Sequence, residues 1–279
     1  MLNTVYKDAI QRREKTLSMI KGPKFEQIVQ KARQNWVEYS PQKKDVVTAG
    51  IDSSFNSTKF QGMELWVVTA VSVKSNGQII KDLHEHGLGY PEIDLSSMAS
   101  KMEIDACEAS VDQAELILMD GSLYSQFMTR QSTLSSTLLK TMRKKGNVIF
   151  VSKTSNTRMQ FVDMDSTAGD IFYYNHATRK PGFSKLFLDP KYGSDRIIAS
   201  IFARLSDSTP LIKLEFLGKD HSEDEIKTVL DKLHKNGVGG YPYVLKLAHN
   251  NCKISNSDLV KLVSLYGLKT EIGSREVLG

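Results

Sequence analysis

Two aspartates close two strongly apolar segments of the sequence. Asp52 follows the run VVTAGI, and Asp120 follows the run ELILM. A carboxylate that ends a buried strand and precedes a small residue points into the crevice at the edge of a sheet. If the two strands lie side by side, the two carboxylates repel each other unless a cation neutralises them. Mg²⁺ and Mn²⁺ prefer such oxygen ligands, so the pair predicts a divalent-metal site.

The helix predicted between these strands carries further carboxylates, Glu103, Asp105 and Glu108. Glu103 is the best candidate for a third ligand because it borders the apolar stripe of the helix, whereas Glu108 lies on a different side and Asp105 is closer to solvent. Each of these acids also has a purely structural interpretation. Aspartates at strand ends often form turns and caps, and acids on helices are often solvated. The residue types alone leave that choice open.

The segment GGYPYVLKLAHNNCKIS, residues 239–255, groups Tyr241, His249 and Lys253 in one unit. Pro242 fits the first position of a helix, and His249 then follows about two turns later. A histidine titrates near neutral pH, so it can ligate a metal or move a proton. A single histidine on a helix is, however, more often a packed or solvated residue.

The elements that must position these residues follow from hydrophobic periodicity, which predicts an α/β fold. We expect helices at residues 4–38 (broken at Gly22-Pro23), 95–111, 123–142, 222–236, 243–252 and 257–265. We expect strands at residues 46–54, 62–74, 77–86, 115–120, 147–153, 185–188, 196–205 and 211–217. The first strands form an antiparallel meander, and Ser222 with Glu225 predicts a capping box. No repeat or linker divides the chain, so we expect a single domain over 1–279, with a helical extension at 1–40 and a core at 45–255.

Composition restricts the class of protein. The chain has 279 residues, of which 40% are hydrophobic and 25% charged, a balance typical of globular proteins. No apolar run reaches the roughly 18 residues that a membrane span needs, and the N-terminus lacks the apolar core of a signal peptide. Cys107 and Cys252 lie far apart, which excludes a zinc site made of cysteines alone and favours reduced, partly buried thiols. We therefore expect a cytoplasmic protein without membrane contact.

Charge is mildly positive, and its placement matters more than its sum. The formal net charge of +5 is compatible with a polyanionic partner without requiring one. Basic residues gather in three places: Lys140, Arg143, Lys144 and Lys145; Arg179, Lys180 and Lys185; and Lys7, Arg12, Arg13 and Lys15. The first two groups could line a path for such a polyanion. Helix-dipole compensation and an ordinary surface loop explain them equally simply, and the third group suits a solvated face or a protein contact.

Taken together, four motifs resemble those of the NurA nucleases of archaea and some bacteria. They are GIDSS, LMDGSL, VSKTS and YPYVLKLAHNNCKIS, and they extend from about residue 46 to residue 255. The last motif combined with the first two is the most specific. The resemblance implies an RNase H-like core with a mixed sheet, flanked by N-terminal and C-terminal helices. It also implies 5′-to-3′ DNA exonuclease activity, with single-strand endonuclease activity as a further expectation, in the processing of DNA ends.

The resemblance implies roles for individual residues. Asp52, Glu103, Asp120 and His249 would hold Mn²⁺ or Mg²⁺, with Glu108 as the alternative helix ligand. Tyr241 and His249 would approach the same site, and Lys153 would lie near the scissile phosphate. The implied partners are DNA ends, a HerA-type hexameric helicase and a second copy of the chain in a ring-like homodimer.

Two other functions remain compatible with the sequence. The chain could be a non-catalytic adaptor or clamp for a DNA-translocating ATPase. It could also be an RNase H-like nuclease with another substrate, such as an RNA–DNA hybrid or branched DNA, because the metal chemistry is shared.

Overall fold

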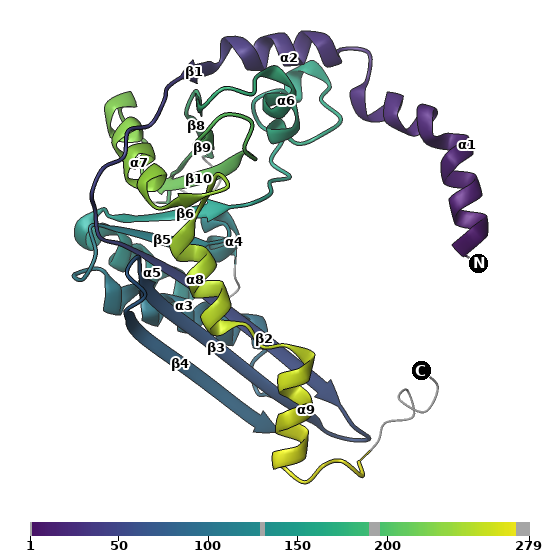
Figure 1. Ribbon diagram of the computed structural model, residues 1–279, viewed down its shortest axis with the longest axis vertical. Coiled ribbons are helices and arrows are strands. Elements are labelled where there is room, and N and C mark those ends of the chain that lie inside the picture. Colours follow the sequence, from purple (N-terminus) through teal and green to yellow (C-terminus); the bar gives the residue numbers. More distant parts are fainter. Residues whose placement is uncertain (1, 129–131, 190–195, 272–279) are drawn as a thin grey trace.

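The structure is a computed structural model, which describes residues 2–128, 132–189 and 196–271. The chain forms a crescent, with helix α1 (Leu2–Lys21) at one tip and helix α9 (Asn256–Leu265) at the other (Figure 1). A curved sheet forms the body of the crescent. In the described part of the chain, that sheet has ten strands in the order β1-β7-β9-β10-β6-β5-β2-β3-β4, with β8 paired to β9.

The strands are short at one end of the sheet and long at the other. Their bounds are β1 Trp36–Glu38, β2 Thr48–Lys59, β3 Glu64–Lys74, β4 Ile79–Leu88, β5 Leu116–Asp120, β6 Val148–Ser152, β7 Gly182–Ser184, β8 Phe187–Asp189, β9 Ile198–Arg204 and β10 Ile212–Leu217. A separate small hairpin joins β11 (Gly237–Val238) to β12 (Tyr241–Pro242). Val, Ile, Leu and Phe fill the central strands, which are buried on both faces.

The central topology confirms an RNase H-like core. β2, β3 and β4 form an antiparallel meander, and β5 and then β6 join β2 in parallel. On the far side of β6, strands β10 and β9 run antiparallel and extend the sheet. The mixed sheet and its flanking helices agree with the predicted fold class.

Helices cover both faces of this sheet. Helices α7 (Glu223–Lys235) and α8 (Tyr243–Cys252) pack on one face, where their Leu230 and Leu245 belong to the same apolar cluster as Leu118 and Val151 of the sheet. Helices α3 (Leu95–Ser110), α4 (Leu123–Met128) and α5 (Ser132–Lys145) pack on the other face through a second apolar cluster. Burial of apolar area at about 25 cal/mol per Å² on each face is the main stabilising contribution.

An aromatic cluster joins the N-terminal region to the sheet. Helix α2 (Phe25–Gln34) packs on helix α6 (Asp170–Ala177), where Tyr173 and Tyr174 are fully buried beside Phe161 and Phe202. The sequence did not predict α6 or the short 3₁₀ helix Val162–Met164. Both lie in a stretch that resembles a polar loop, and their order comes from tertiary packing of the aromatic rings.

Several predicted boundaries were wrong by a few residues. The helix expected through residue 38 ends at Gln34, and Trp36–Glu38 instead pair with β7 as an edge strand. Of the helix expected at 123–142, the structure describes α4 and α5, and residues 129–131 lie outside the described chain. Pro242 precedes α8 as its N-cap rather than occupying its first turn. The predicted capping box of Ser222 and Glu225 is present at the start of α7. No described helix combines the length and apolar character needed to cross a membrane.

Candidate active site

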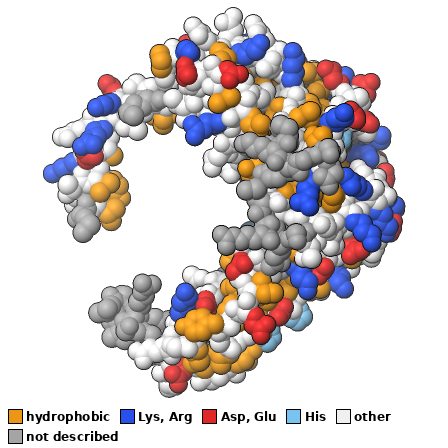
Figure 2. Space-filling view, turned by 180° about the vertical axis from the view of Figure 1, so that it is seen from behind, with side chains coloured by type: hydrophobic (Ala, Val, Ile, Leu, Met, Phe, Trp, Pro, Cys, Tyr) orange, Lys and Arg blue, Asp and Glu red, His pale blue; other side chains and the backbone are white. Residues whose placement is uncertain are grey.

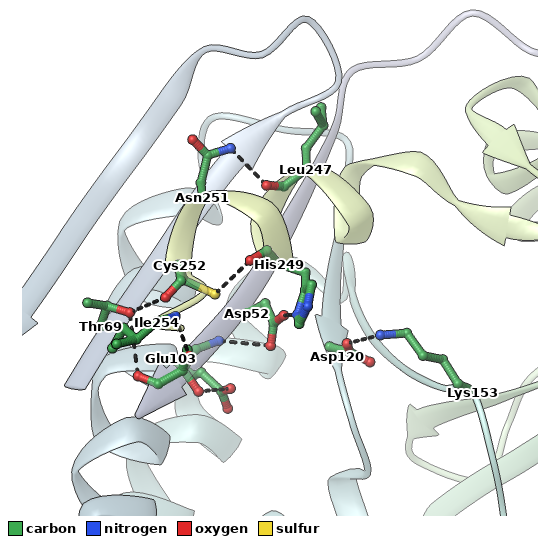
Figure 3. Close-up of polar contacts among 12 residues, drawn as sticks. Asp52, Thr69, Glu103, Asp120, Lys153, Leu247, His249, Asn251, Cys252 and Ile254 are labelled. Atoms are coloured by element: carbon green, nitrogen blue, oxygen red, sulfur yellow. Dashed lines mark hydrogen bonds and ion pairs between the residues drawn. The ribbon is translucent and has the colours of Figure 1, made fainter. Parts of the chain in front are cut away.

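Asp52 lies where β2 leaves one of its two neighbours. β2 pairs with β5 only as far as Ile51, whereas its pairing with β3 continues to Lys59. The strand was expected to end near Asp52; instead it continues, and Asp52 is the first residue beyond the parallel ladder. Its side chain is 11% exposed, and Nδ1 of His249 lies 3.0 Å from its Oδ2 atom (Figure 3). Burial and the neighbouring charge of Asp120 raise the pKa of Asp52, against the opposing effect of His249.

Glu103 is the acid of α3 that faces this site. Its side chain is buried, whereas Asp105 and Glu108 on the same helix are exposed. The Ser53 hydroxyl donates to Oε1 at 2.5 Å, and the Gln126 amide donates to Oε2 at 3.1 Å. Burial, together with the charges of Asp52 and Asp120, raises the pKa of Glu103 to about 8. Glu103 is thus a carboxyl group with neutral hydrogen-bond partners and acidic neighbours.

Asp120 is the last residue of β5 and the most accessible of these acids, with 17% of its side chain exposed. The Lys153 ammonium lies 2.8 Å from Oδ2, and the Tyr241 hydroxyl donates to Oδ1 at 3.0 Å. The same ammonium stands 4.9 Å from the centre of the Tyr241 ring, a cation–π contact. Burial and the charge of Asp120 raise the pKa of Tyr241, so this hydroxyl stays protonated and acts as a donor.

The C-terminal motif reaches this edge because α8 rests directly on β2. A Cβ atom on Gly50 would overlap the backbone carbonyl of Val244, so only glycine permits this approach. Two further bonds fix the end of α8: the Thr69 hydroxyl donates to the Cys252 carbonyl at 2.5 Å, and the Ile254 amide donates to Ser54 at 3.2 Å. His249 is therefore held above Asp52 by backbone contacts on both sides of it (Figure 3).

All six residues singled out from the sequence meet at one edge of the sheet. They are Asp52, Glu103, Asp120, Lys153, Tyr241 and His249. Hydrogen bonds join Lys153 and Tyr241 to Asp120, and His249 to Asp52. Lys253 is the C-cap of α8, where its backbone amide donates to the His249 carbonyl at 2.9 Å; within the described residues, no recorded contact joins its side chain to the other five. Within the described residues, no three His, Cys, Asp or Glu side chains already form a metal-binding cluster. In this arrangement His249, Lys153 and Tyr241 engage the carboxylate oxygens instead.

Sequence reasoning missed the polar residues that support the site. Ser53 and Gln126 hold Glu103, and Lys213 forms a buried ion pair with Glu215 on β10, two strands away from Asp120. The run LIKLEFL carries a signal for the pair, because alternation places Lys213 and Glu215 on the same face of one strand. Cys107 and Cys252 are free and buried, and burial raises the pKa of the Cys107 thiol to about 12.

Residues of the first two basic clusters form ion pairs or hydrogen bonds with neighbouring side chains, whereas those of the third are exposed on α1. Lys144 and Lys145, in the last turn of α5, both pair with Asp112. Lys180 pairs with Glu38, and Arg179 donates to Asn175 at 3.1 Å. These contacts agree with the structural interpretation of the clusters. The basic residues of α1 are exposed near the tip of the crescent (Figure 2).

Comparison with known proteins identifies the family. A model of the NurA domain matches residues 46–254. A curated relative, the DNA double-strand break repair nuclease NurA of Sulfurisphaera tokodaii, is 21% identical over 96% of each chain. The solved NurA nuclease from Sulfolobus solfataricus is 22% identical, covers 96% of this chain and 97% of its own, and superposes with a TM-score of 0.82. A NurA structure bound to dAMP and manganese is 13% identical over 97% of this chain and 98% of its own, with a TM-score of 0.65. The chain belongs to the NurA family of nucleases.

Proposed function

We propose that the protein is a divalent-metal-dependent DNA nuclease whose reaction takes place at Asp52, Glu103 and Asp120. One observation carries this proposal. These carboxylates come from β2, α3 and β5, and each of the two buried ones has its pKa raised by burial and by acidic neighbours. A partly dry crevice that gathers three carboxyl groups beside a single ammonium, that of Lys153, favours a bound cation.

The donor set fits Mn²⁺ or Mg²⁺. Carboxylate oxygens suit both ions, and the His249 imidazole adds a ligand that Mn²⁺ accepts more readily. A NurA structure with bound manganese supports this choice of ion. A bound divalent cation would activate water and stabilise the charge that develops on a phosphodiester. Asp52, Glu103, Asp120 and His249 would hold it, and Glu103 would have to lose its proton first.

The remaining residues of the site position the substrate. Lys153 presents a compact positive charge beside Asp120 and would hold the scissile phosphate once a cation takes over the aspartate. The Tyr241 hydroxyl, which stays protonated, would donate to a phosphate oxygen or to Asp120. About half of the His249 side chain is exposed (47%), so its ring is also accessible to water.

We infer that the substrate is DNA with a free end, degraded in the 5′-to-3′ direction, with cleavage within single strands as a further activity. The names of the relatives, which are DNA double-strand break repair nucleases, support DNA as the substrate. The dAMP bound to another NurA agrees with a nucleotide 5′-monophosphate as the product. A HerA-type helicase would feed DNA to the crescent during end resection.

A second copy of the chain is the partner that the surface of α1 favours. Apolar side chains are exposed along this helix, among them Leu2, Val5, Ile10 and Leu17, and Ile10 is 76% exposed. Such a stripe on a helix of one isolated chain is typical of an interface. We propose that α1 contributes to a homodimer. Light scattering of Ile10→Glu beside the wild-type protein tests this, and an unchanged mass for a dimeric wild type would exclude α1 from the interface.

The test of the nuclease is degradation of end-labelled linear DNA, single- and double-stranded, with Mn²⁺, with Mg²⁺ and with EDTA. Wild type should release label only with metal. Asp52→Asn and Asp120→Asn should lose at least about 10³-fold in rate while folding and DNA binding persist. Asp105→Asn, on the exposed side of α3, is the matched control and should behave as wild type. Metal-independent cleavage, or full activity of Asp120→Asn, would overturn the proposed site. Failure of wild type under every condition, even with a cognate helicase, would favour the adaptor function.

A further inference from the structure

A polar cavity lies beside Asp120, on the side away from Asp52. Its volume is about 470 Å³, and its lining comes from the loops that follow β5 and β6 and from β10. The residues that matter here are Ser122, Ser152, Thr154, Thr157, Arg158 and Lys213. None of the described side chains that line the cavity is acidic, although Ser122, one of them, lies only two residues after Asp120. The sheet edge therefore changes from acidic to hydroxyl-rich and basic over a few strands.

The two cations of this cavity differ in how far they are neutralised. Lys213 is 7% exposed, and its ammonium contacts Glu215 and donates to the Thr157 hydroxyl at 3.1 Å. Glu215 also accepts from the Leu123 amide at 2.5 Å and from the Ser122 hydroxyl at 3.3 Å, so its charge is shared among three donors. Arg158 is exposed and has no ion-pair partner that the structure records within the described chain. The cavity thus presents a free guanidinium beside a partly balanced ammonium.

The loop that carries Arg158 is held in place from behind. Asp170 is fully buried at the start of α6, and its Oδ2 atom accepts from the backbone amides of Met159 at 2.8 Å and Gln160 at 3.1 Å. Ser155 donates to Thr157 at 2.9 Å within the same loop. The aromatic cluster beneath α6 anchors this arrangement. The cavity is consequently formed before any ligand arrives, which lowers the entropic cost of binding.

Strand register gives the distance to the proposed active site. Asp120 pairs with Val151 on β6, and Ser152, the next residue of β6, pairs with Lys213 on β10. Neighbouring strands lie about 4.8 Å apart, so Lys213 is roughly 10 Å across the sheet from β5. Lys153, which follows Ser152, extends toward Asp120 (Figure 3).

We propose that this cavity binds a phosphodiester of the DNA strand that is being cleaved, close to the cleaved bond in that strand. Arg158 is the main charged contact of this phosphodiester. Arginine, serine and threonine are the side chains that position nucleic-acid backbones, and such contacts fix the register of the strand. The inference rests on the proposed nuclease function. Arg158 positions the strand and takes no part in bond breaking, so its loss acts on substrate binding.

The experiment combines Arg158→Gln with DNA in which single phosphodiesters are replaced by neutral methylphosphonates, one position at a time around the cleaved bond. Arg158→Gln should raise KM about tenfold with kcat nearly unchanged, because one hydrogen bond to a charged group is lost. It should also reduce the slope of log affinity against log salt by about 1. For wild type, one neutral linkage close to the cleaved bond should weaken binding to a similar extent. For Arg158→Gln, the same linkage should cause no further loss.

Lys227→Gln is the control, since it removes a partly exposed cation on α7, which is paired with Asp224 and lies away from the cavity. It should leave KM, the salt slope and the methylphosphonate profile as in wild type. If Arg158→Gln and a neutral linkage weaken DNA binding additively at every position of the linkage, the inference is overturned. It is also overturned if the two changes are coupled only at a terminal 5′-phosphate. These outcomes require active wild type, so they are separate from a failure of the nuclease proposal, in which wild type itself does not cleave.

Discussion

Two buried glutamates at the same edge of the sheet have opposite surroundings. Glu215 is fully buried and is balanced by Lys213, by a backbone amide and by a hydroxyl. Glu103 is 8% exposed, yet its partners are the neutral Ser53 and Gln126, and the charges nearest to it are acidic. The chain thus balances the negative charge of Glu215 with its own groups, whereas it provides no positive charge for Glu103.

The difference separates a structural charge from one that awaits a ligand. Burying a carboxylate is costly unless a cation or several donors accompany it. At Glu215 the chain supplies the cation. At Glu103 it supplies none, and burial favours the protonated form. The missing positive charge is what the proposed metal would provide.

The largest expected effect is on catalysis. Glu103→Gln keeps the size and one hydrogen-bond acceptor of the side chain, and it should reduce the rate of DNA cleavage by about 10³-fold. Its free energy of unfolding should be unchanged or higher, because a poorly compensated acid is removed. The matched variant Glu215→Gln should show the reverse pattern: lower stability, and most of the activity retained by the folded protein. Urea denaturation and single-turnover cleavage measure the two quantities. Equal patterns for both variants would remove the distinction between the glutamates.

A smaller effect is expected when the buried ion pair of Lys213 and Glu215 is broken by replacing the lysine. Lys213→Met leaves Glu215 without its cation and should lower the free energy of unfolding by about 3 kcal/mol. Adding Glu215→Gln to this variant should recover part of the loss, since the buried charge is then gone. Denaturant midpoints of the single and double variants decide the matter. If the double variant is less stable than Lys213→Met, the unpaired charge of Glu215 is not the cause of the stability loss in Lys213→Met.

The next effect is a pH dependence of the metal-free protein. The pKa of Glu103 is raised from 4.5 to about 8 on folding, so the folded state holds a proton that the unfolded state releases. Stability from this group is fully present below about pH 4.5 and is lost as the pH rises toward about 8. The slope should be a fraction of the ~1.4 kcal/mol per pH unit that one proton allows. Denaturation in EDTA across this range should show the slope in wild type and a weaker one in Glu103→Gln. An identical slope in both proteins would assign the titration to another group.

The smallest effect concerns an exposed pair. Lys180 and Glu38 form an ion pair at 3.2 Å, but both side chains are more than half exposed. Lys180→Gln should change the free energy of unfolding by less than about 0.5 kcal/mol. DNA affinity at moderate salt should also stay as in wild type if the second basic cluster is only a surface loop. A clear loss of affinity would instead return Arg179, Lys180 and Lys185 to the DNA path.

Much of the fold and the site could be predicted because the signals are local. Asp52 and Asp120 each follow an apolar run that could only be a buried strand, and Ser222 with Glu225 is a complete helix start within four residues. The positions of Tyr241, His249 and Lys153 came from the resemblance to a family. The structure shows hydrogen bonds from these residues to the aspartates, which the sequence did not predict, whereas their metal-binding and catalytic roles stay predictions.

The rest depends on contacts between distant parts of the chain. Helix α6 is only eight residues long and is stabilised by the burial of Tyr173 and Tyr174 against α2 and Trp36, which periodicity does not reveal. Lys213 and Glu215 alternate with apolar residues on β10, and such a pattern normally indicates a solvent-facing side of a strand. Here the start of α4 covers that side, since its Leu123 amide binds Glu215. No local pattern predicts which segment covers which strand.

The direct contact between Gly50 and the first turn of α8 has a consequence for the order of events on the ribosome. Asp52 and His249, which this contact brings together, are 197 positions apart in the chain. Chains fold as they emerge, beginning with the part made first. The strands that carry the carboxylates can therefore assemble while the segment with Tyr241 and His249 is still being translated. An enzyme that cuts DNA would then acquire its full set of site residues only after residue 249 has been synthesised, and a chain terminated between Asp120 and Tyr241 would carry the acids without Tyr241 and His249.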